Sequence, residues 1–313
     1  MTNIRDIARL SGYSVSTVSR VINRQNYVSE ATRTAIQKVV DELDYVPNAV
    51  ARDLSRGRTQ NVGVVLPHSD HPYFTQLVHG IMRAAFEANY HVVLLPSKYD
   101  AALELQYLED LRQKAYDALI FTSHGLPLTE LNHYRRYGSI VVCENPQRCP
   151  IPAAYAERQA TYEAAFNHLK QRGANHIGIL ASRDVAISAT TQAMVQAYQT
   201  VFGQPLAAAA IFTGVATPAD GDRAGQYFLT QIPTVDAVLT NGDDIAVGML
   251  RAYRRAGVKP PYLIGQEHQL AGEALNLPTI DHHFEEVGAR AFKLAITGQT
   301  QNVAIPSEFL LPK

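Results

Sequence analysis

Cysteine is scarce in this 313-residue sequence, and several signals that mark other classes of protein are missing. Its two cysteines, Cys143 and Cys149, are too few for a disulfide framework or a zinc site. No apolar run reaches membrane length, and the N-terminus leads into a charged helix pattern instead of a signal peptide. A Gly-x-Gly-x-x-Gly fingerprint, a Walker-type loop and a serine nucleophile elbow are also absent. We therefore expect a cytoplasmic protein with no catalytic residues, no cofactor and no metal.

Charge is nearly balanced over the whole chain but unevenly placed. The sequence has 28 Lys and Arg against 29 Asp and Glu. Residues 1–58 hold nine of the basic and six of the acidic residues, which leaves 19 basic and 23 acidic residues in the remainder. A basic front end on an acidic body is typical of a protein that contacts nucleic-acid phosphates with one end only.

The first 23 residues carry the pattern of two short helices joined by a tight turn. Apolar residues recur at helical spacing over Ile4 to Leu10, Ser11-Gly12 breaks the pattern, and Ser14 can cap a second helix. The inner face of that helix is Val15 or Thr17, with Val18, Val21 and Ile22, while its outer face is small and polar. This arrangement predicts a helix-turn-helix whose second helix enters the major groove. An amphipathic hairpin within a helical bundle is the alternative.

A third helix is expected from a cap at Ser29 through Leu43, after which Pro47 ends the domain. One more short helical segment, Ala49 to Arg56, is too small to be stable alone. With these segments in place, the sequence resembles the lactose-repressor (LacI-type) family of transcription regulators. The motifs that carry the resemblance are Asp6-Ile-Ala8, Thr17-Val-Ser-Arg-Val21 with Asn23, Val28-Ser29, Thr32-Arg33, Leu43-Asp-Tyr-Val-Pro-Asn48 and Ala51-Arg-Asp-Leu54. It covers essentially the whole chain, less tightly after residue 180.

The resemblance implies a set of DNA contacts in the front end. Arg20 is the candidate for a bidentate contact to guanine, and Val15 and Ser16 hold the two positions that vary operator preference. Residues expected to anchor phosphate groups are Thr17, Asn23, Ser29 and Thr32. Helix packing is the alternative role for Thr17. The hinge would order only on DNA and beside a partner hinge, with Leu54 as a minor-groove wedge and Asn48 and Ala51 among the contacts.

After Gln60 the sequence alternates short apolar runs with helical stretches. The predicted strands are Asn61 to Pro67, His91 to Pro96, Ala118 to Thr122, Ser139 to Cys143, His176 to Ala181, Ala210 to Phe212, Ala237 to Thr240 and Tyr262 to Gly265. This rhythm predicts an α/β protein with two lobes, each a doubly wound parallel sheet. We expect a helix-turn-helix headpiece at 1–46, a hinge at 47–60 and a core at 61–313. The N-lobe would take about 61–156 and 286–304, and the C-lobe about 157–285 and 305–313.

For this core the resemblance implies a periplasmic-binding-protein-like fold that closes on a small effector, most plausibly a sugar. Ligands of open α/β sheets bind beyond the carboxyl ends of the strands. The first expected contacts are Tyr73 and Phe74, which could stack on a ring, with Ser69 or Asp70 beside them. Phe74 could instead simply pack its helix on the sheet. Glu144 and Glu267 follow strands in opposite lobes, and Asp243 keeps an acidic place in Asn241-Gly-Asp-Asp244.

Two features depart from the family pattern. Gly242 falls where a ligand-binding Asn is usual, and Met194 occupies the place of an Arg, which leaves Gln192 as the nearest polar substitute. Arg183 could reach the cleft from a loop or lie on the surface. His282 is also expected at the cleft, although a metal site with its neighbour His283 is not, because adjacent residues on an extended segment point to opposite sides.

The sequence therefore predicts a homodimeric repressor that binds a pseudo-palindromic operator in double-stranded DNA and contacts no membrane. An effector that changes the angle between the lobes would alter hinge spacing, a coupling of about 1–3 kcal/mol. Three alternatives stay open: a core that answers to a protein partner, a core that no longer binds a sugar, and a solute-binding or enzymatic α/β protein with an incidental hairpin.

Overall fold

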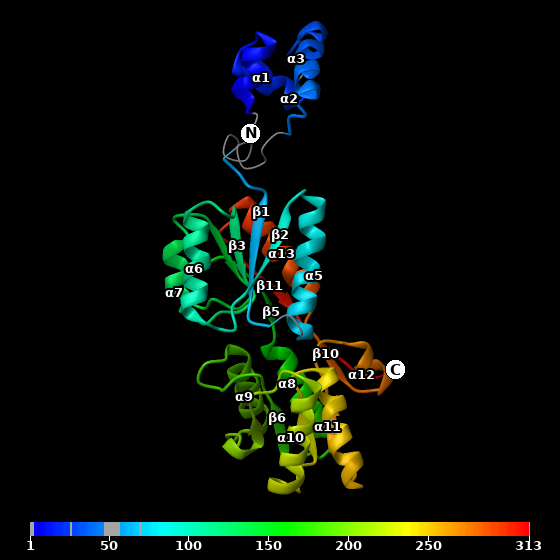
Figure 1. Cartoon of the computed structure of the whole chain (residues 1–313). Helices are drawn as coiled ribbons and strands as arrows, with labels where there is room; N and C mark the ends of the chain where they lie inside the picture. The colour runs from blue at the N-terminus through cyan, green and yellow to red at the C-terminus, as the bar shows by residue number, and fades with distance from the viewer. Residues whose placement is uncertain (1–2, 26, 47–56, 69–70, 313) are drawn as a thin grey trace. The chain divides into compact units, whose positions relative to one another are not determined.

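The computed structural model describes residues 3–25, 27–46, 57–68 and 71–312 (Figure 1). Contacts divide the chain into two compact units, Met1–Gln60 and Asn61–Lys313. Five residues of the predicted sites lie outside the described residues: Asn48, Ala51, Leu54, Ser69 and Asp70. Within the described ranges no helix has the length and apolar character needed to cross a membrane.

The first unit consists of three helices, α1 (Ile4–Ser11), α2 (Val15–Ile22) and α3 (Glu30–Glu42). Local signals set their ends. The side chain of Asn3 accepts hydrogen bonds from the first turn of α1, and Gly12 ends that helix in the left-handed region at φ 74°. Ser14 and Ser29 cap α2 and α3 by accepting from the backbone N–H groups of Thr17 and Thr32. The buried core is small: Ile7, Ala8, Val18, Val21 and Ile36.

The N-lobe of the second unit is built on a six-stranded parallel sheet of order β11-β5-β4-β3-β1-β2. Its strands are β1 (Asn61–Leu66), β2 (His91–Pro96), β3 (Ala118–Phe121), β4 (Ser139–Val142), β5 (Ala153–Glu157) and β11 (Asn302–Pro306). Two helices cover each face (Figure 1). They are α5 (Pro72–Glu87) and α13 (Phe284–Thr297) on one side, and α6 (Ala101–Arg112) and α7 (Leu128–Tyr134) on the other.

The C-lobe has a four-stranded parallel sheet of order β7-β6-β8-β9. Its strands are β6 (Ile177–Leu180), β7 (Ile211–Phe212), β8 (Ala237–Leu239) and β9 (Tyr262–Ile264). The helices α8 (Gln159–Gln171) and α9 (Ala189–Phe202) pack on one face, and α10 (Pro218–Gln231) and α11 (Asp243–Ala256) on the other. A short helix, α12 (Leu270–Ala274), precedes β10 (Thr279–Asp281), which pairs antiparallel with β12 (Glu308–Leu310).

Each lobe holds one helix pair whose backbones approach so closely that only glycine fits. In the N-lobe, a Cβ atom at Gly80 or Gly288 would overlap the backbone of the facing helix in the α5–α13 pair. In the C-lobe, Gly221 and Gly248 play the same part in the α10–α11 pair. The two lobes thus share a packing device as well as a parallel sheet.

Three chain segments link the lobes. The chain leaves the N-lobe between β5 and α8, returns between β10 and α13, and leaves again between β11 and β12. These crossings are tied together: Ser307 N–H donates to Glu157 O at 3.1 Å, and the Thr161 hydroxyl donates to Ser307 O at 2.9 Å. The edge where the strands β1, β3 and β4 end therefore faces the C-lobe across a short bridge of three segments.

Candidate DNA-contacting helix and core cavity

Helix α2 presents a polar face to solvent because its apolar residues Val18 and Val21 are buried against α1 and α3. Ser16 and Arg20 are exposed on that face, and Val15 is 43% exposed. The sequence left open whether Val15 or Thr17 belongs to the inner face of α2. Thr17 is half-buried and Val15 is exposed, so Thr17 is the inner residue of the two. An exposed arginine flanked by small side chains can approach a base edge without steric obstruction.

The predicted phosphate anchors take part in hydrogen bonds at the ends of α2 and α3, where Ser29 is the N-cap of α3 and Asn23 the C-cap residue of α2. The Thr17 hydroxyl lies 2.9 Å from the Ser14 hydroxyl, and the Ser29 and Thr32 hydroxyls lie 2.9 Å apart. Asn23 donates its side-chain amide to Ser19 O at 2.8 Å. These bonds fix the side chains at the N-termini of α2 and α3 and at the end of α2. DNA contact by these residues, and by Val15, Ser16 and Arg20, stays a prediction.

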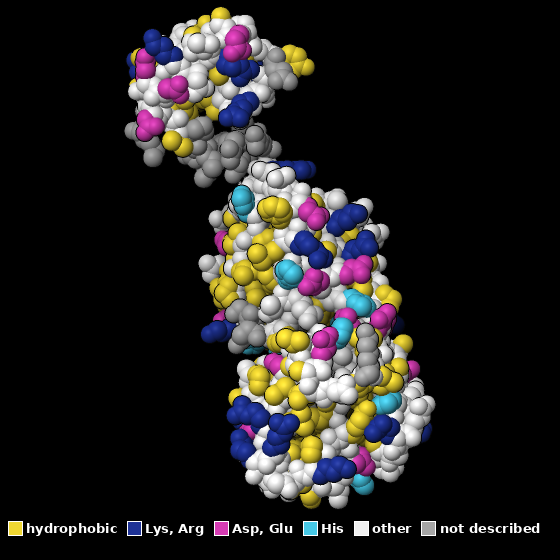
Figure 2. All heavy atoms as spheres, turned by 90° about the vertical axis from the view of Figure 1, so that its right-hand side faces the viewer, with side chains coloured by type: hydrophobic (Ala, Val, Ile, Leu, Met, Phe, Trp, Pro, Cys, Tyr) yellow, Lys and Arg dark blue, Asp and Glu magenta, His cyan; other side chains and the backbone are white. Residues whose placement is uncertain are grey.

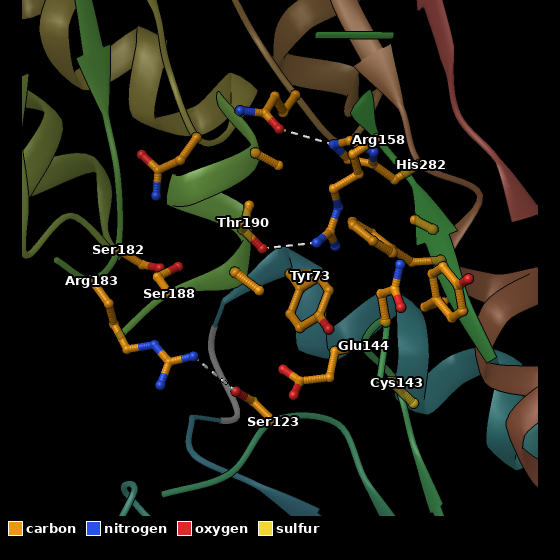
Figure 3. Close-up of a pocket in the computed structure, with 18 of the residues that line it drawn as sticks. Tyr73, Ser123, Cys143, Glu144, Arg158, Ser182, Arg183, Ser188, Thr190 and His282 are labelled. Carbon is orange, nitrogen blue, oxygen red and sulfur yellow. Dashed lines mark hydrogen bonds between the residues drawn. The ribbon is translucent and has the colours of Figure 1, made fainter. Parts of the chain in front are cut away.

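A cavity of about 500 Å³ lies between the two core lobes (Figure 3). Its walls come mainly from residues that directly follow the parallel strands. Ser123 follows β3, Glu144 follows β4, Arg183 follows β6, and Asn241 follows β8. This is the position at which an open α/β sheet binds ligands, because the carboxyl ends of neighbouring strands leave a crevice there.

The structure brings most of the predicted effector residues to this one cavity. The seven that line it are Tyr73, Phe74, Glu144, Arg183, Gln192, Glu267 and His282. Contact of these side chains with an effector stays a prediction. Asp243, which was also predicted to contact the effector, is not among the residues that line the cavity.

The N-lobe side of the cavity is aromatic. The ring of Tyr73 packs edge-on against Phe74 at 4.7 Å and against Phe284 at 4.6 Å between centroids. Its hydroxyl donates to Thr122 O at 3.0 Å, and burial raises the pKa of this phenol, so it stays protonated. Phe74 lines the cavity and also packs in the hydrophobic core of the N-lobe, so the packing role is present, and stacking on an effector ring stays a prediction.

Glu144 is paired rather than free. Its carboxylate lies 2.7 Å from Nε2 of His124, and the Leu126 carbonyl oxygen lies 2.6 Å from Nδ1 of the same ring. Burial lowers the pKa of His124, but the hydrogen bond and charge of Glu144, with the Leu126 carbonyl and Glu104, outweigh it, and the net pKa is raised. His124 therefore compensates the negative charge of Glu144.

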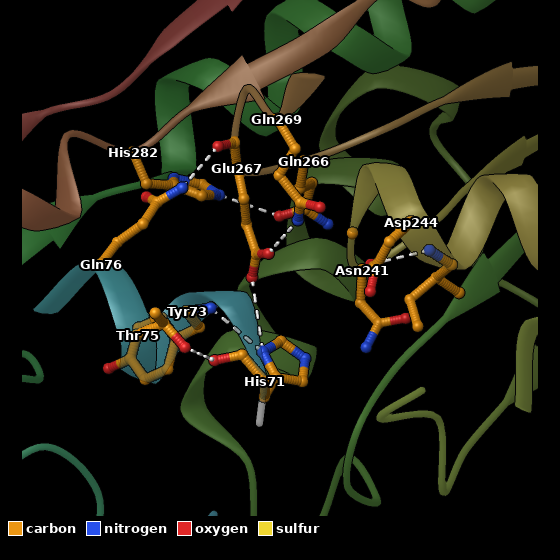
Figure 4. A network of polar contacts seen from close by, with 12 residues as sticks. His71, Tyr73, Thr75, Gln76, Asn241, Asp244, Gln266, Glu267, Gln269 and His282 are labelled. Atoms are coloured by element: carbon orange, nitrogen blue, oxygen red, sulfur yellow. Dashed lines mark hydrogen bonds and ion pairs between the residues drawn. The ribbon is translucent and has the colours of Figure 1, made fainter. Parts of the chain in front are cut away.

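Glu267 is a buried side chain, with 4% of its surface exposed, and not a solvated loop charge (Figure 4). Burial raises its pKa well above the usual value, and the charges of Asp244 and Asp243 raise it further. The carboxyl lies 3.7 Å from Nδ1 of His71, and the Glu267 backbone carbonyl accepts from the Gln76 amide at 2.9 Å. Because His71 and Gln76 belong to the N-lobe, these contacts join the lobes at one side of the cavity.

Asp243 requires a correction. It is fully buried and is not among the residues that line the cavity, and its carboxylate accepts from Gln269 N–H and from the Thr279 hydroxyl, both at 2.7 Å. Burial raises its pKa to about 6 despite these bonds. It fastens the segment after β9, whereas Asn241, two residues earlier, lines the cavity and donates to Val215 O at 2.8 Å. The buried Asn241 Oδ1 has no hydrogen-bond partner among the described residues.

Arg158 is a charged residue of the cavity that the sequence interpretation missed. It lies in the first crossing segment, donates to the Thr190 hydroxyl at 2.8 Å, and its guanidinium carbon is 5.9 Å from the centre of the Tyr73 ring. No motif marks this position, and only the fold brings it beside α9. Arg183, which was predicted, stacks over Tyr99 at 4.4 Å and contacts the Ser123 hydroxyl at 3.5 Å.

His282 lies at the second crossing and is almost fully buried. Its ring nitrogens lie 2.8 Å from the Ser307 hydroxyl and 2.9 Å from Oε1 of Gln266. Burial lowers its pKa well below the usual value, and the charges of Arg158 and His283 lower it further, so the ring is neutral. Met194 is buried behind Gln266, 3.7 Å from that residue's side-chain amide. The described residues contain no group of three or more His, Cys, Asp or Glu arranged to hold a metal ion.

Comparisons with known proteins agree with both halves of this description. Residues 3–48 match the family model of bacterial regulatory proteins of the lacI family. Residues 59–312 match the model of periplasmic binding proteins and the sugar binding domain of the LacI family. Catabolite control protein B of Bacillus subtilis (strain 168) is 36% identical over 309 residues, which is 99% of each chain.

Two further relatives extend the comparison. The ribose operon repressor of Halalkalibacterium halodurans (strain ATCC BAA-125 / DSM 18197 / FERM 7344 / JCM 9153 / C-125) is 26% identical over 95% of this chain and 90% of its own. Among solved structures, the lac repressor dimer bound to operator and the anti-inducer ONPF superimposes with a TM-score of 0.83 at 20% identity, covering 100% of this chain and 98% of that one. The resemblance and the fold class predicted from sequence are thus confirmed: this chain belongs to the lacI family of DNA-binding bacterial transcriptional regulators, and it is not an enzyme.

Proposed function

We propose that the chain is a homodimeric repressor that binds a pseudo-palindromic operator in the cytoplasm and is controlled by a sugar-like effector in the core cavity. One observation carries this proposal: a cavity of about 500 Å³ at the strand ends is walled by both lobes, in a chain that also carries a helix-turn-helix. Aromatic rings and hydrogen-bonding side chains on facing walls suit a sugar, which presents apolar ring faces and hydroxyl groups.

The dimer is supported by an apolar surface on the N-lobe. Phe86 and Met82 on α5 are 83% and 52% exposed, and Leu94 on the edge strand β2 is 47% exposed. Figure 2 shows hydrophobic side chains gathered on one side of the upper core lobe, the lobe that carries α5. Large apolar patches of this kind mark protein–protein contacts. A second copy of this chain on that surface would pair two headpieces, as a pseudo-palindromic operator requires.

Control by an effector would act through the contacts between the lobes. His71 and Gln76 meet Glu267 on one side of the cavity, and Ser123 meets Arg183 on the other. A ligand that contacts both walls favours one angle between the lobes over another, since it can only shift the equilibrium through contacts that differ between the two states. The expected coupling to DNA affinity is about 1–3 kcal/mol.

The test is the affinity of the full-length protein for a DNA fragment selected from a random pool, measured against unrelated DNA at the same salt concentration. Arg20→Ala should weaken binding to the selected fragment by about 1–3 kcal/mol and spare unrelated DNA, because a base contact carries the specificity. Lys38→Ala, at an exposed position of α3, is the matched control. Equal losses on both DNAs would remove Arg20 as a base-reading residue, and no preference for any fragment would overturn the proposed function.

A further inference from the structure

Two guanidinium groups face the core cavity without a carboxylate partner. Among the described residues, neither Arg158 nor Arg183 has a carboxylate oxygen within ion-pair distance. Arg158 makes one hydrogen bond, to Thr190, although a guanidinium carries five N–H donors. Its Nε atom is buried and has no hydrogen-bond partner among the described residues. A buried donor of a charged group is costly when nothing accepts from it, so this wall lacks an acceptor.

The carboxylates that face the same cavity do not supply that acceptor. Glu144 is held by His124 at 2.7 Å. Glu267 is buried, and burial raises its pKa; its carboxyl accepts from the Gln269 side-chain amide at 2.7 Å and lies 3.7 Å from Nδ1 of His71. Glu157 is exposed and accepts from Gln159 N–H at 3.3 Å. Among the described residues, Arg158 and Arg183 thus have no carboxylate within ion-pair distance, and an anionic group that enters the cavity can bind them.

The surroundings of Arg158 fit an anion better than a hydroxyl group alone. The Thr190 hydroxyl, to which Arg158 donates, lies in the first turn of α9, a helix of 14 residues, and Ser188, Ala189 and Thr190 all line the cavity. Figure 3 shows the Arg158 side chain directed toward Thr190, with Ser188 and Arg183 lying beyond Thr190 on the left of the view. A planar guanidinium matches the two oxygens of a carboxylate or phosphate.

We propose that the effector of this protein carries an anionic group, a carboxylate or a phosphate, that binds Arg158 beside the first turn of α9, with Arg183 adding a second positive charge. This inference rests on the proposed function, because it assigns the chemical class of the effector in the same cavity. The aromatic wall formed by Tyr73 and Phe284 would hold the uncharged part of the molecule. The predicted class is thus a sugar acid or a sugar phosphate rather than a neutral sugar.

The experiment uses full-length protein and matched sets of probes: a hexose, the corresponding hexonate, the corresponding hexose 6-phosphate, and inorganic phosphate. Binding is measured by calorimetry and by the shift in thermal unfolding, which rises with bound ligand by mass action. The hexonate or the hexose phosphate should bind at least roughly 10-fold more tightly than the hexose, since charge-assisted hydrogen bonds exceed neutral ones by that order. The stronger of the two distinguishes a carboxylate from a phosphate effector.

Variants separate the arginines from general effects of charge. Arg158→Gln should reduce affinity for the anionic probe by roughly 10- to 100-fold, and Arg183→Gln by a smaller factor, while affinity for the hexose changes little. Arg290→Gln, at an exposed arginine of α13, is the matched control and should change nothing. Without ligand, all three variants should keep the far-ultraviolet circular dichroism spectrum of the unmodified protein, which shows that they fold.

Equal affinity for hexose and anionic probes, or full anion binding by Arg158→Gln, would overturn this inference and leave the proposed function intact. Binding of none of these probes, with specific DNA binding retained, would overturn both this inference and the sugar-controlled part of the proposed function. If the unmodified protein shows no preference for the selected DNA over unrelated DNA, the proposed repressor function is overturned.

Discussion

The two core lobes have similar folds but contribute opposite chemistry to the cavity between them. The N-lobe supplies rings, Tyr73, Phe74 and Phe284, together with one compensated ion pair, Glu144 with His124. The segments that start and form the C-lobe supply guanidinium, hydroxyl, amide and carboxyl groups, with Arg158 and Arg183 the positively charged members. The parallel sheet of each lobe sets the position of the cavity, whereas the residues that follow each strand determine which ligands the cavity can bind. The comparison can be tested at three levels.

The largest effects are expected where the lobes are alike, at their glycine-packed helix pairs. Gly288→Ala in the N-lobe and Gly248→Ala in the C-lobe each place a Cβ atom against a facing backbone carbonyl, of Leu77 and Pro218 respectively. Backbone cannot move aside as a side chain can, so each change should lower the free energy of unfolding by about 3 kcal/mol. Urea unfolding measures this, with Glu286→Ala as an exposed control on α13. Losses below about 1 kcal/mol would show that the helix pairs have room to separate.

A smaller effect should distinguish the lobes at their buried carboxylates. Glu104 in the N-lobe accepts from Gly125 N–H, Leu126 N–H and the Ser97 hydroxyl at 2.9–3.0 Å. Glu104→Gln should cost about 2 kcal/mol, because hydrogen bonds to a charged acceptor are the strong ones. Asp243→Asn in the C-lobe should cost about 1 kcal/mol, because burial raises the pKa of Asp243 to about 6 and its charge is poorly stabilised.

The raised pKa of Asp243 also predicts how the stability of the chain depends on pH. Asp243 has a pKa raised in the folded chain from the ordinary 3.8 to about 6. The stability that its protonated form contributes is fully present below pH 3.8 and is lost as the pH rises through about 6. Urea unfolding of Asp243→Asn should therefore lose less stability between pH 4 and pH 7 than the unmodified chain does. Identical pH profiles would contradict the raised pKa.

The smallest effects concern single hydrogen bonds on the two cavity walls. Tyr73→Phe removes the bond to Thr122 O and keeps the aromatic contacts, so it should cost about 1 kcal/mol of stability. Thr190→Val removes the acceptor of Arg158 on the other wall and should cost about 0.5 kcal/mol, since solvent in the cavity can replace it. Thermal unfolding measures the loss of stability in both variants. A larger loss for Thr190→Val than for Tyr73→Phe would contradict this prediction.

The headpiece could be predicted well from sequence because its signals are local. Serine caps at Ser14 and Ser29, a left-handed glycine at Gly12 and an apolar stripe ending in Val21 lie within a few residues of the features that they determine. The eight predicted core strands also coincide with strands of the structure, since apolar runs such as Asn61–Leu66 are buried on both faces. The strands β5, β10, β11 and β12 were missed for different reasons. β10 and β12 have only three residues each, and β11 is mostly exposed. β5 is buried but consists largely of alanine, which is depleted in strands.

The cavity residues were predictable mainly where they follow strands or begin the helix α5, as Tyr73 does. Glu144, Arg183 and Glu267 each follow an apolar run, so the sequence itself pointed to them. Arg158 comes from a crossing segment, and nothing local shows that it meets Thr190, which lies 32 positions later in the chain. Asp243 misled the prediction for the opposite reason: its place after a strand looked correct, but a carboxylate with two nearby donors turns toward them instead.

The route of the chain through the crossings sets an order of assembly during synthesis. The four-stranded sheet of the C-lobe uses strands within residues 177–264, an uninterrupted stretch that can fold as soon as it leaves the ribosome. The six-stranded sheet waits for β11 at 302–306, and its covering helix α13 begins only at Phe284. Until those residues emerge, the sheet face beneath α13 and the edge of β5 stay uncovered, so the nascent N-lobe exposes apolar surface for longer than the C-lobe sheet does.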